Sequence, residues 1–286
     1  MIYRRLEPED FEAMYDTFIE AFSDYQIKIQ MTRERFNAIN IRRGLNYELS
    51  VGAFDHNNKM VGLTLNGTDV WNDKPTAYDM GTGVIPKYRR KGIGNAMFAF
   101  LLPKLREAGV KHYLLEVLRS NKRAYELYKK KGFKETRKFE CLKIGLTKLI
   151  TKNIACKDTT IAQIEKPEWN AFRSFWDWKP SWQNSINSIK RSPERKVSLG
   201  AFHKNELRGY GILCPESGDI AQIAVDKHFR RRGIGSLLLK EFAGRAETTG
   251  KLSILNIDSS SKETLSFFES AGFENLAGQY EMMLEL

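Results

Sequence analysis

The stretch "KYRRKGIGNAMF", residues 87–98, places three consecutive cations before two glycines and the start of a helical pattern. Apolar residues then recur at Ile93, Met97, Leu101 and Leu105, a spacing that lines one face of an α-helix. A helix N-terminus leaves backbone N–H groups without partners and carries partial positive charge, which suits a phosphate. The stretch therefore predicts a phosphate-binding turn, with a solvated basic turn and a nucleic-acid contact as the alternatives.

The same turn occurs twice in the chain, so the chain is compared with itself as two repeats. "VIPKYRRKGIG" returns as "VDKHFRRRGIG", so that Gly92 and Gly233 stand 141 residues apart (233 minus 92). A strand, polar turn and strand also repeat, as "SVGAFDHNNKMVGLTL" and "SLGAFHKNELRGYGIL". The sequence therefore predicts two domains, residues 1–146 and 147–286. Each runs through a helix-rich start, a β-hairpin, a strand, the basic turn, a helix, a strand, a helix and a final strand.

The first turn and the sequence after it form a longer pattern. It fits neither a P-loop nor a dinucleotide fingerprint, since GxxxxGK[ST] is absent and GxGxxG would need a glycine at Met97. The run "GTGVIPKYRRKGIGNAMF" followed by "LLEVLRSNKRAYELYKKKGF" instead resembles the GNAT superfamily of N-acetyltransferases. The superfamily pattern is R/Q-x-x-G-x-G/A followed by N-x-x-A-x-x-L-Y-x-x-x-G-F. Its positions are filled by Arg89, Gly92, Gly94, Asn121, Ala124, Leu127, Tyr128, Gly132 and Phe133. The resemblance covers most of residues 1–145, and a weaker version covers 160–286.

The resemblance implies an α/β (α+β) fold of two tandem GNAT-like domains, each a twisted mixed β-sheet flanked by helices. The sheet opens between two central strands, where the pantetheine arm of acetyl-CoA lies with its pyrophosphate on the basic turn. In the first domain the implied cofactor contacts are Gly83, Val84, Arg89, Arg90, Lys91, Gly92, Ile93, Gly94, Asn95 and Asn121. In the second domain they are Val225, Arg230, Arg231, Arg232, Gly233, Ile234, Gly235 and Ser236.

Acetyl transfer to an ammonium group needs a base for its proton and an acid for the departing thiolate. Tyr128 occupies the position of the usual acid of the family, and a core aromatic is the alternative role for its ring. Glu116 lies on a predicted strand twelve residues before Tyr128, as does a glutamate proposed to act in ribosomal-protein alanine acetyltransferases of the family. We expect Glu116 to be the base, with Asp79 as the second candidate and an outward-facing strand glutamate as the structural alternative.

The second copy departs from the pattern at the chemical positions. Tyr128 becomes Phe268, and Glu116 becomes Asn256. Because phenylalanine cannot donate a proton and asparagine cannot act as a carboxylate base, we expect the first domain to be catalytic. The second domain is then a degenerate copy that still binds acetyl-CoA or only completes the structure.

The resemblance to the family implies that two further segments form walls of the acceptor cleft. "WNAFRSFWDWKPSW" begins the second domain with four tryptophans, which we expect to pack, in part against the first domain. In the first domain, Asp24 and Tyr25 are candidate acceptor contacts, with a helix cap and a surface aromatic as the alternatives.

The amino-acid composition limits the kinds of ligand, metal site and membrane segment that we expect. The formal net charge of +11 favours anionic ligands. The three cysteines share no CxxC spacing and the four histidines no HxxxH or HExxH spacing, so we expect no metal site. No apolar run is long enough to span a bilayer, and acidic residues follow the N-terminus where a signal peptide would be apolar. We therefore expect a cytoplasmic protein without a membrane partner.

Three functions compete at this stage. The first is an acetyl-CoA-dependent N-acetyltransferase that acts on a primary amine by direct attack in a ternary complex. The second is a non-enzymatic acyl-CoA-binding or regulatory protein, which the degenerate copy suggests. The third is nucleic-acid binding, which we disfavour because an RNP-type aromatic motif and a zinc knuckle are absent. The sequence assigns no particular amine, small molecule or peptide, and no oligomeric state.

Overall fold

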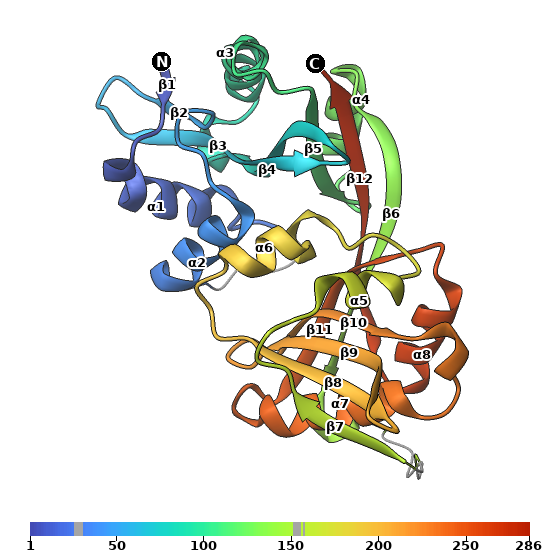
Figure 1. Cartoon of the computed structure of the whole chain (residues 1–286). Coiled ribbons are helices and arrows are strands. Elements are labelled where there is room, and N and C mark those ends of the chain that lie inside the picture. The colour runs from blue at the N-terminus through green and yellow to red at the C-terminus, as the bar shows by residue number, and fades with distance from the viewer. Residues whose placement is uncertain (26–30, 151–155, 157) are drawn as a thin grey trace.

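The computed structural model describes residues 1–25, 31–150, 156 and 158–286 (Figure 1). The first repeat holds strands β1 (Ile2–Arg5), β2 (Val51–Phe54), β3 (Met60–Trp71), β4 (Lys74–Val84), β5 (His112–Leu118) and β6 (Lys134–Gly145). Its helices are α1 (Phe11–Ala21), α2 (Arg33–Arg43), α3 (Ile93–Glu107) and α4 (Lys122–Lys130).

The second repeat follows the same order of strands and α-helices, but its first two helices are shorter than those of the first repeat. Its strands are β7 (Thr159–Gln163), β8 (Val197–His203), β9 (Glu206–Cys214), β10 (Asp219–Val225), β11 (Lys251–Asp258) and β12 (Glu274–Glu285). Its helices are α5 (Trp169–Ser174), α6 (Ile186–Arg191), α7 (Ile234–Arg245) and α8 (Lys262–Ser270), and a short 3-10 helix, η4, spans Trp182–Asn184. The two predicted hairpins, β2–β3 and β8–β9, and the helix after each basic turn are confirmed.

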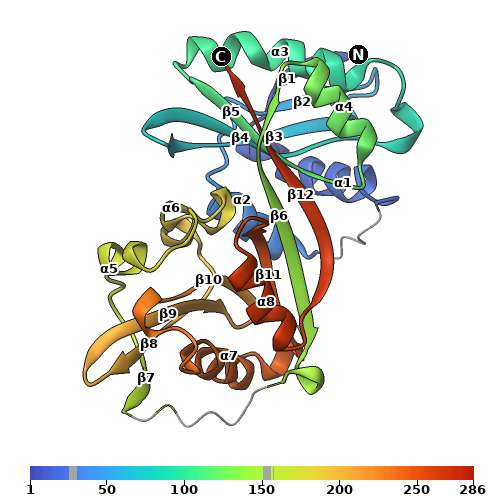
Figure 2. The ribbon, with the colours of Figure 1, turned by 90° about the vertical axis from the view of Figure 1, so that its right-hand side faces the viewer.

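The strands of both repeats form one mixed sheet in the order β1-β2-β3-β4-β5-β12-β6-β11-β10-β9-β8-β7. The final strands are exchanged: β12 of the second repeat pairs with β5 of the first, and β6 of the first repeat pairs with β11 of the second. β6 and β12 also pair with each other, and Figures 1 and 2 show them running between the two halves. Each half of the sheet is therefore completed by a strand of the other.

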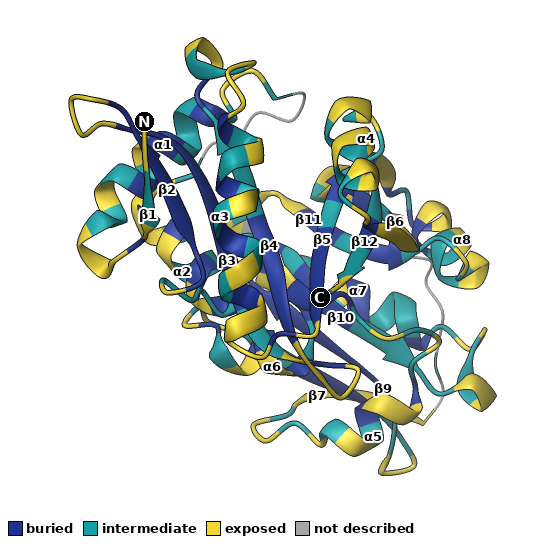
Figure 3. Cartoon of the chain, turned by 90° about the horizontal axis from the view of Figure 1, so that it is seen from above, coloured by how far each residue is buried: buried dark blue, intermediate teal, exposed yellow. Residues whose placement is uncertain are grey.

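Helices cover both faces of the sheet, as in other open α/β architectures. In the first half, Leu115 and Val117 of β5 pack in a core with Leu105 of α3, while Leu114 packs in a core with Met14 of α1. Successive residues of a strand point to opposite faces, so α3 and α4 lie on one face and α1 and α2 on the other. Figure 3 shows the strands buried between these helices, whose outer faces are exposed.

The sheet opens at the same position in both repeats. β4 pairs with β5 in parallel only as far as Asp79 and Leu115, although both strands continue. β10 pairs with β11 only as far as Ile220 and Ile254. A register shift lies next to each point, in the β3–β4 and β9–β10 ladders. Such irregularities bend a strand, and here they accompany the parting of β4 from β5 and of β10 from β11.

The junction between the two halves is apolar at Trp182. Its ring stacks on Tyr78 at a centroid distance of 5.1 Å and lies 5.7 Å from the ring of Trp71. Its Nε1–H donates to the backbone oxygen of Arg43 at 2.9 Å. The prediction that part of the tryptophan-rich segment packs against the first domain is confirmed for this residue.

Candidate active site

The two basic turns have the same backbone geometry. Arg90 and Gly92 have φ angles of 61° and 78°, and the corresponding Arg231 and Gly233 have 62° and 87°. Left-handed residues at alternate positions turn neighbouring N–H groups toward one concavity, which is the geometry of an anion-binding nest. A methyl group on Gly92 or Gly94 would meet no atom within 4 Å, so the space before α3 is open. Both turns therefore have the backbone form of an anion-binding nest, but in the second a methyl group on Gly235 would lie 2.9 Å from the Phe267 ring, so the space before α7 is narrower.

The first arginine of the first turn points away from that space. The guanidinium of Arg89 donates to both carboxylate oxygens of Asp24, at 2.6 and 2.8 Å, and to the backbone oxygens of Val84 and Ala21. It fastens the end of α1 to the end of β4. A direct contact of Arg89 with phosphate therefore remains a prediction, and Asp24 lies in an ion pair at the end of β4.

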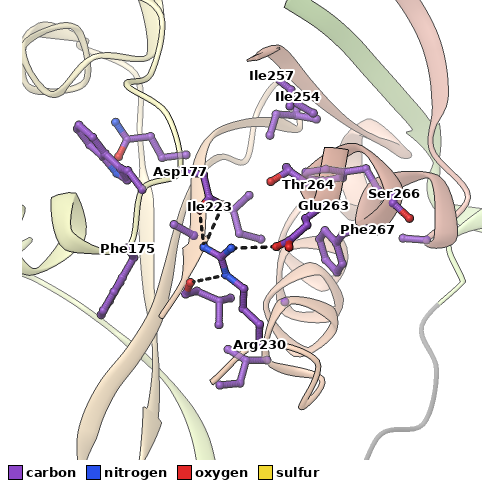
Figure 4. Close-up of a pocket in the computed structure, with 18 of the residues that line it drawn as sticks. Phe175, Asp177, Ile223, Arg230, Ile254, Ile257, Glu263, Thr264, Ser266 and Phe267 are labelled. Atoms are coloured by element: carbon purple, nitrogen blue, oxygen red, sulfur yellow. Dashed lines mark hydrogen bonds and ion pairs between the residues drawn. The ribbon is translucent and has the colours of Figure 1, made fainter. Parts of the chain in front are cut away.

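The second turn repeats this anchor. Arg230 pairs with Asp177 at 2.9 Å and with Glu263 at 3.1 Å, and donates to the backbone oxygen of Val225 (Figure 4). Asp24 and Asp177 stand in "FSDY" and "FWDW", a short repeat that the sequence comparison missed because the spacing differs from that of the turns. The remaining basic side chains of the turns, Arg90, Lys91, Arg231 and Arg232, are exposed.

Asp79 and Tyr128 meet where β4 and β5 separate. The Tyr128 hydroxyl donates to Oδ2 of Asp79 at 3.2 Å, and the Thr82 hydroxyl donates to the same oxygen at 2.8 Å. The Gly81 N–H donates to Oδ1 at 2.9 Å. Burial raises the pKa of Asp79 to about 6, against the lowering effect of these donors. Burial, and then the adjacent Asp79 charge, raise the pKa of Tyr128 well above its ordinary value, so the phenol keeps its proton.

Glu116 lies on the other face of the sheet. It is the first residue of β5 beyond the last pair with β4, and its side chain points to the face of α1 and α2, as that of Leu114 does. Its Oε2 accepts from Asn256 Nδ2 at 2.7 Å and from Gln183 Nε2 at 3.4 Å. Its Oε1 is buried and has no hydrogen-bond partner among the residues that the structure describes. Burial raises the pKa of this carboxyl group.

The three titratable groups thus flank one opening from two sides. Tyr128 and Asp79 lie on the face of α3 and α4, and Glu116 lies on the opposite face. A reacting group held between β4 and β5 would have a phenol on one side and a carboxylate on the other.

Residues at the end of α1 lie close to the first opening. The Asn121 side chain caps α4 by accepting from the Ala124 N–H at 3.1 Å, and its Nδ2 donates to the Tyr25 hydroxyl at 3.2 Å. A methyl group on Gly83 would lie 3.0 Å from the ring of Phe22. The predicted contacts Gly83 and Asn121 are therefore brought to one place, next to the candidate acceptor contact Tyr25.

The larger of the two cavities described in this structure lies in the second domain, although the sequence places catalysis in the first. It has a volume of about 1020 Å³ and extends from the turn of Arg230 to the opening between β10 and β11 (Figure 4). Its wall is largely apolar and includes Ile223, Ile254, Ile257, Phe267 and Phe268.

Polar side chains at the inner end of this cleft bond to each other. The Tyr210 hydroxyl donates to Gln222 Oε1 at 2.8 Å, and Gln222 Nε2 donates to the backbone oxygen of Asn184 at 2.7 Å. Phe268 and Ile220 stand where the first domain has Tyr128 and Asp79. The second cleft therefore has room for a ligand but lacks the phenol and the carboxyl group that Tyr128 and Asp79 place at the first opening.

Within the described ranges, no group of three histidine, cysteine, aspartate or glutamate side chains is arranged to hold a metal ion. Across the same ranges, the helices are too short or too polar to cross a bilayer.

A parallel strand pair that opens beside an anion-binding turn, with a phenol and two carboxyl groups at the opening, suits a ligand that carries phosphate. The chain belongs to the GNAT acetyltransferase family and carries two of its domains. The family model described as "Acetyltransferase (GNAT) family" matches residues 11–133, and the one described as "Acetyltransferase (GNAT) domain" matches residues 170–282.

A curated relative supports the same membership over a shorter region. The chain is 36% identical over 93 residues to the [ribosomal protein bS18]-alanine N-acetyltransferase of Escherichia coli strain K12. The match covers 32% of the chain and 57% of that relative, so the chain spans little more than half the length of the curated relatives it matches.

Solved structures share the whole architecture. A GCN5-related N-acetyltransferase from Sphaerobacter thermophilus has a TM-score of 0.74 at 16% identity, covering 99% of the chain and 95% of its own. A tandem GNAT protein from the clavulanic acid biosynthesis pathway has a TM-score of 0.74 at 13% identity, covering 99% and 98%. At these identities the likeness shows the fold, including its tandem arrangement.

Proposed function

We propose that the first domain, residues 1–146, transfers the acetyl group of acetyl-CoA to a primary amine by direct attack in a ternary complex. The observation that carries the proposal is the placement of Tyr128 and Glu116 on opposite faces of the opening between β4 and β5. This placement supplies a proton donor on one side and a proton acceptor on the other, as the reaction requires.

Residues of the first turn suit the carrier. The N–H groups from Arg90 to Asn95 would hold the pyrophosphate, since the nest and the start of α3 point N–H groups into open space. The edge of β4 beyond Asp79, which includes Gly83 and Val84, is not paired with β5, so an extended arm could hydrogen-bond there beside the contact that Arg89 makes with the Val84 oxygen. Acetyl-CoA supplies a thioester whose carbonyl carbon forms a C–N bond with the amine as its C–S bond breaks.

Protons move at two named atoms. Oε1 of Glu116, which has no partner among the described residues, takes the proton that the amine loses. The hydroxyl of Tyr128 gives its proton to the departing sulfur. Asp79 bonds to Tyr128 on the face away from Glu116, so we assign it to orienting the phenol and not to receiving the amine proton.

The test is thiol release from acetyl-CoA in the presence of a panel of amines. A peptide that begins with alanine is the first acceptor to try, because the curated relative is named for acetylating an alanine of a ribosomal protein. Small polyamines and lysine peptides complete the panel. We expect at least one amine to release thiol in the wild type and Glu116→Gln to lose most of that turnover. Absence of turnover with every amine would refute the proposed activity.

We also propose that the second domain binds acyl-CoA without turning it over. The specific observation is a cleft of about 1020 Å³ that reaches the second nest and carries Phe268 at the position of the acid. Calorimetric titration of CoA into the full chain tests this proposal by counting sites, and we expect two.

A further inference from the structure

Asn256 of β11 crosses the junction between the two domains. Its side chain is 2% exposed, and its Nδ2 donates to Oε2 of Glu116 at 2.7 Å and to Oγ of Ser181 at 3.1 Å. Its Oδ1 accepts from Nε2 of Gln279 at 2.9 Å. Because a carboxylate and an amide donor lie on its two sides, the network fixes which end of the amide faces Glu116.

The backbone at Asn256 is shaped for this contact. Its φ is 63°, in the left-handed region that asparagine tolerates better than most residues. The ladder between β11 and β6 shifts register between Ile254 and Ile257, on either side of Asn256. A bulge re-aims a side chain, and this one turns the amide of the second domain toward the first.

Other charged and titratable groups near Glu116 come from four elements. Arg43 of α2 and Glu281 of β12 act on its charge, and the Tyr78 hydroxyl of β4 lies beside it. Arg137 of β6 also acts on this site but is bound to Glu281 at 2.6 Å. Of the hydrogen bonds that the described residues donate to the Glu116 carboxyl, the one from Asn256 is the shortest.

We propose that Asn256 is a positioning residue for the base of the first domain: it holds Oε2 of Glu116, so that Oε1 is left to take the amine proton. This inference rests on the proposed function of Glu116. The residue that stands where a base would be in the second domain thereby serves the base of the first, and the second domain is a working part of the first domain's site.

Asn256→Asp tests this role with little change of shape, since aspartate also tolerates a positive φ. The substitution removes the donor and sets a second carboxyl group 2.7 Å from Glu116. Loss of a hydrogen bond to a charged group and the new like charge both favour the protonated base. We expect the acid limb of the pH profile of kcat/KM to move up by about one pH unit or more, with the KM for acetyl-CoA unchanged.

A second readout needs no turnover. The pKa of Glu116 in the full chain can be followed by ¹³C NMR of its side-chain carboxyl, assigned by its loss in Glu116→Gln. It should rise by about one unit or more in Asn256→Asp. Asn256→Gly, which accepts the backbone angle and removes the donor without adding charge, should raise it by a smaller amount.

Asn275→Asp is the matched control. Asn275 donates to Oε2 of Glu140 at 2.9 Å in the same sheet, so the variant makes the same chemical change at an exposed amide–carboxylate pair. It should leave both the Glu116 titration and the pH profile unchanged.

The outcomes separate this inference from the proposed function. An active wild type whose acid limb and Glu116 titration stay in place in both Asn256 variants would overturn the positioning role and leave the activity standing. A shifted titration in a protein that acetylates no amine would support the contact and refute the function assigned to Glu116.

Discussion

Tyr128 donates a hydrogen bond of 3.2 Å to Asp79 at the point where β4 leaves β5. In the second domain the same two positions hold Phe268 and Ile220, which are both buried and apolar. The two repeats therefore share a sheet opening and an anion-binding turn but differ in the side chains at both of these positions. This contrast is the basis for assigning acetyl transfer to one opening and ligand binding alone to the other.

Tyr128→Phe should reduce kcat by about 100-fold or more, because it removes the proton donor for the sulfur while keeping the ring in its core. The KM for acetyl-CoA should change little. Tyr125→Phe is the control on the same helix, since its hydroxyl bonds to Glu135 at the surface, and it should keep full turnover. Thiol release under steady-state conditions measures both variants, and full turnover in Tyr128→Phe would reject the assigned acid.

Asp79 should make the free energy of unfolding fall as pH rises between about 4 and about 6. Its pKa is raised from 3.8 to about 6, so in this window the folded state holds a proton that the unfolded state has lost. A shift of about two units corresponds to about 3 kcal/mol. Asp79→Asn cannot ionise and should lack this part of the slope. Urea unfolding at pH 4.0 to 7.5 compares the two proteins.

Asp10→Asn is the control for the same measurement, because it removes a carboxyl group whose pKa is lowered and not raised. Arg4 bonds to Asp10 at 2.6 Å and lowers its pKa from 3.8, so Asp10 stabilises the fold at every pH above about 4 and loses that effect only at lower pH. The variant should therefore lose stability by a similar amount from pH 4.0 to 7.5 and keep the slope that Asp79 produces. Equal slopes in the wild type and Asp79→Asn would show that the carboxyl group is not titrating in this window.

Gly233→Ala should remove one of two CoA sites. Gly233 has a φ of 87°, so a Cβ strains the nest by about 1 kcal/mol and displaces the N–H groups that would hold phosphate. We expect calorimetry to count two sites in the wild type and one in the variant, with turnover retained. Gly92→Ala makes the same change in the first turn and should lose turnover while keeping the second site. If the wild type binds CoA at only one site and Gly233→Ala still binds it, the second domain does not bind CoA.

Local pattern was sufficient to predict much of this architecture. The alternation of the two hairpins, the apolar spacing after Gly92 and Gly233, and the strand that carries Glu116 are properties of short segments, and the structure contains all of them. The family resemblance added the opening of the sheet, which no periodicity in the sequence marks.

Which strands pair with each other across the sheet could not be predicted from local pattern. β6 and β12 are the final strands of related repeats, so either can complete either half, and the alternating pattern is the same for both pairings. The contact between Asn256 and Glu116 depends on that exchange and on a positive φ, neither of which a single sequence reveals. For the same reason, the sequence shows only that Asn256 replaces a carboxylate, and not that it contacts Glu116.

Trp182→Ala should destabilise the protein by about 3–5 kcal/mol, because it opens a large cavity between the two halves. The side chain is 1% exposed, stacks on Tyr78 and donates to the backbone oxygen of Arg43, so neither half can fill its place without moving. Trp182→Phe keeps the ring contact and leaves that oxygen unpaired, which should cost about 1–3 kcal/mol.

Trp169→Ala is the control for the loss of an indole that does not join the halves. Trp169 packs on Phe172 and is partly exposed, so its removal should cost less than Trp182→Ala. Denaturant unfolding of the full chain, followed by circular dichroism, gives the three free energies. If Trp182→Ala cost no more than Trp169→Ala, the stacked ring would contribute little to holding Glu116 and Asn256 together. The coupling of the two domains would then rest on the exchanged strands and on polar contacts such as those of Arg42 with Gln183 and Asn184.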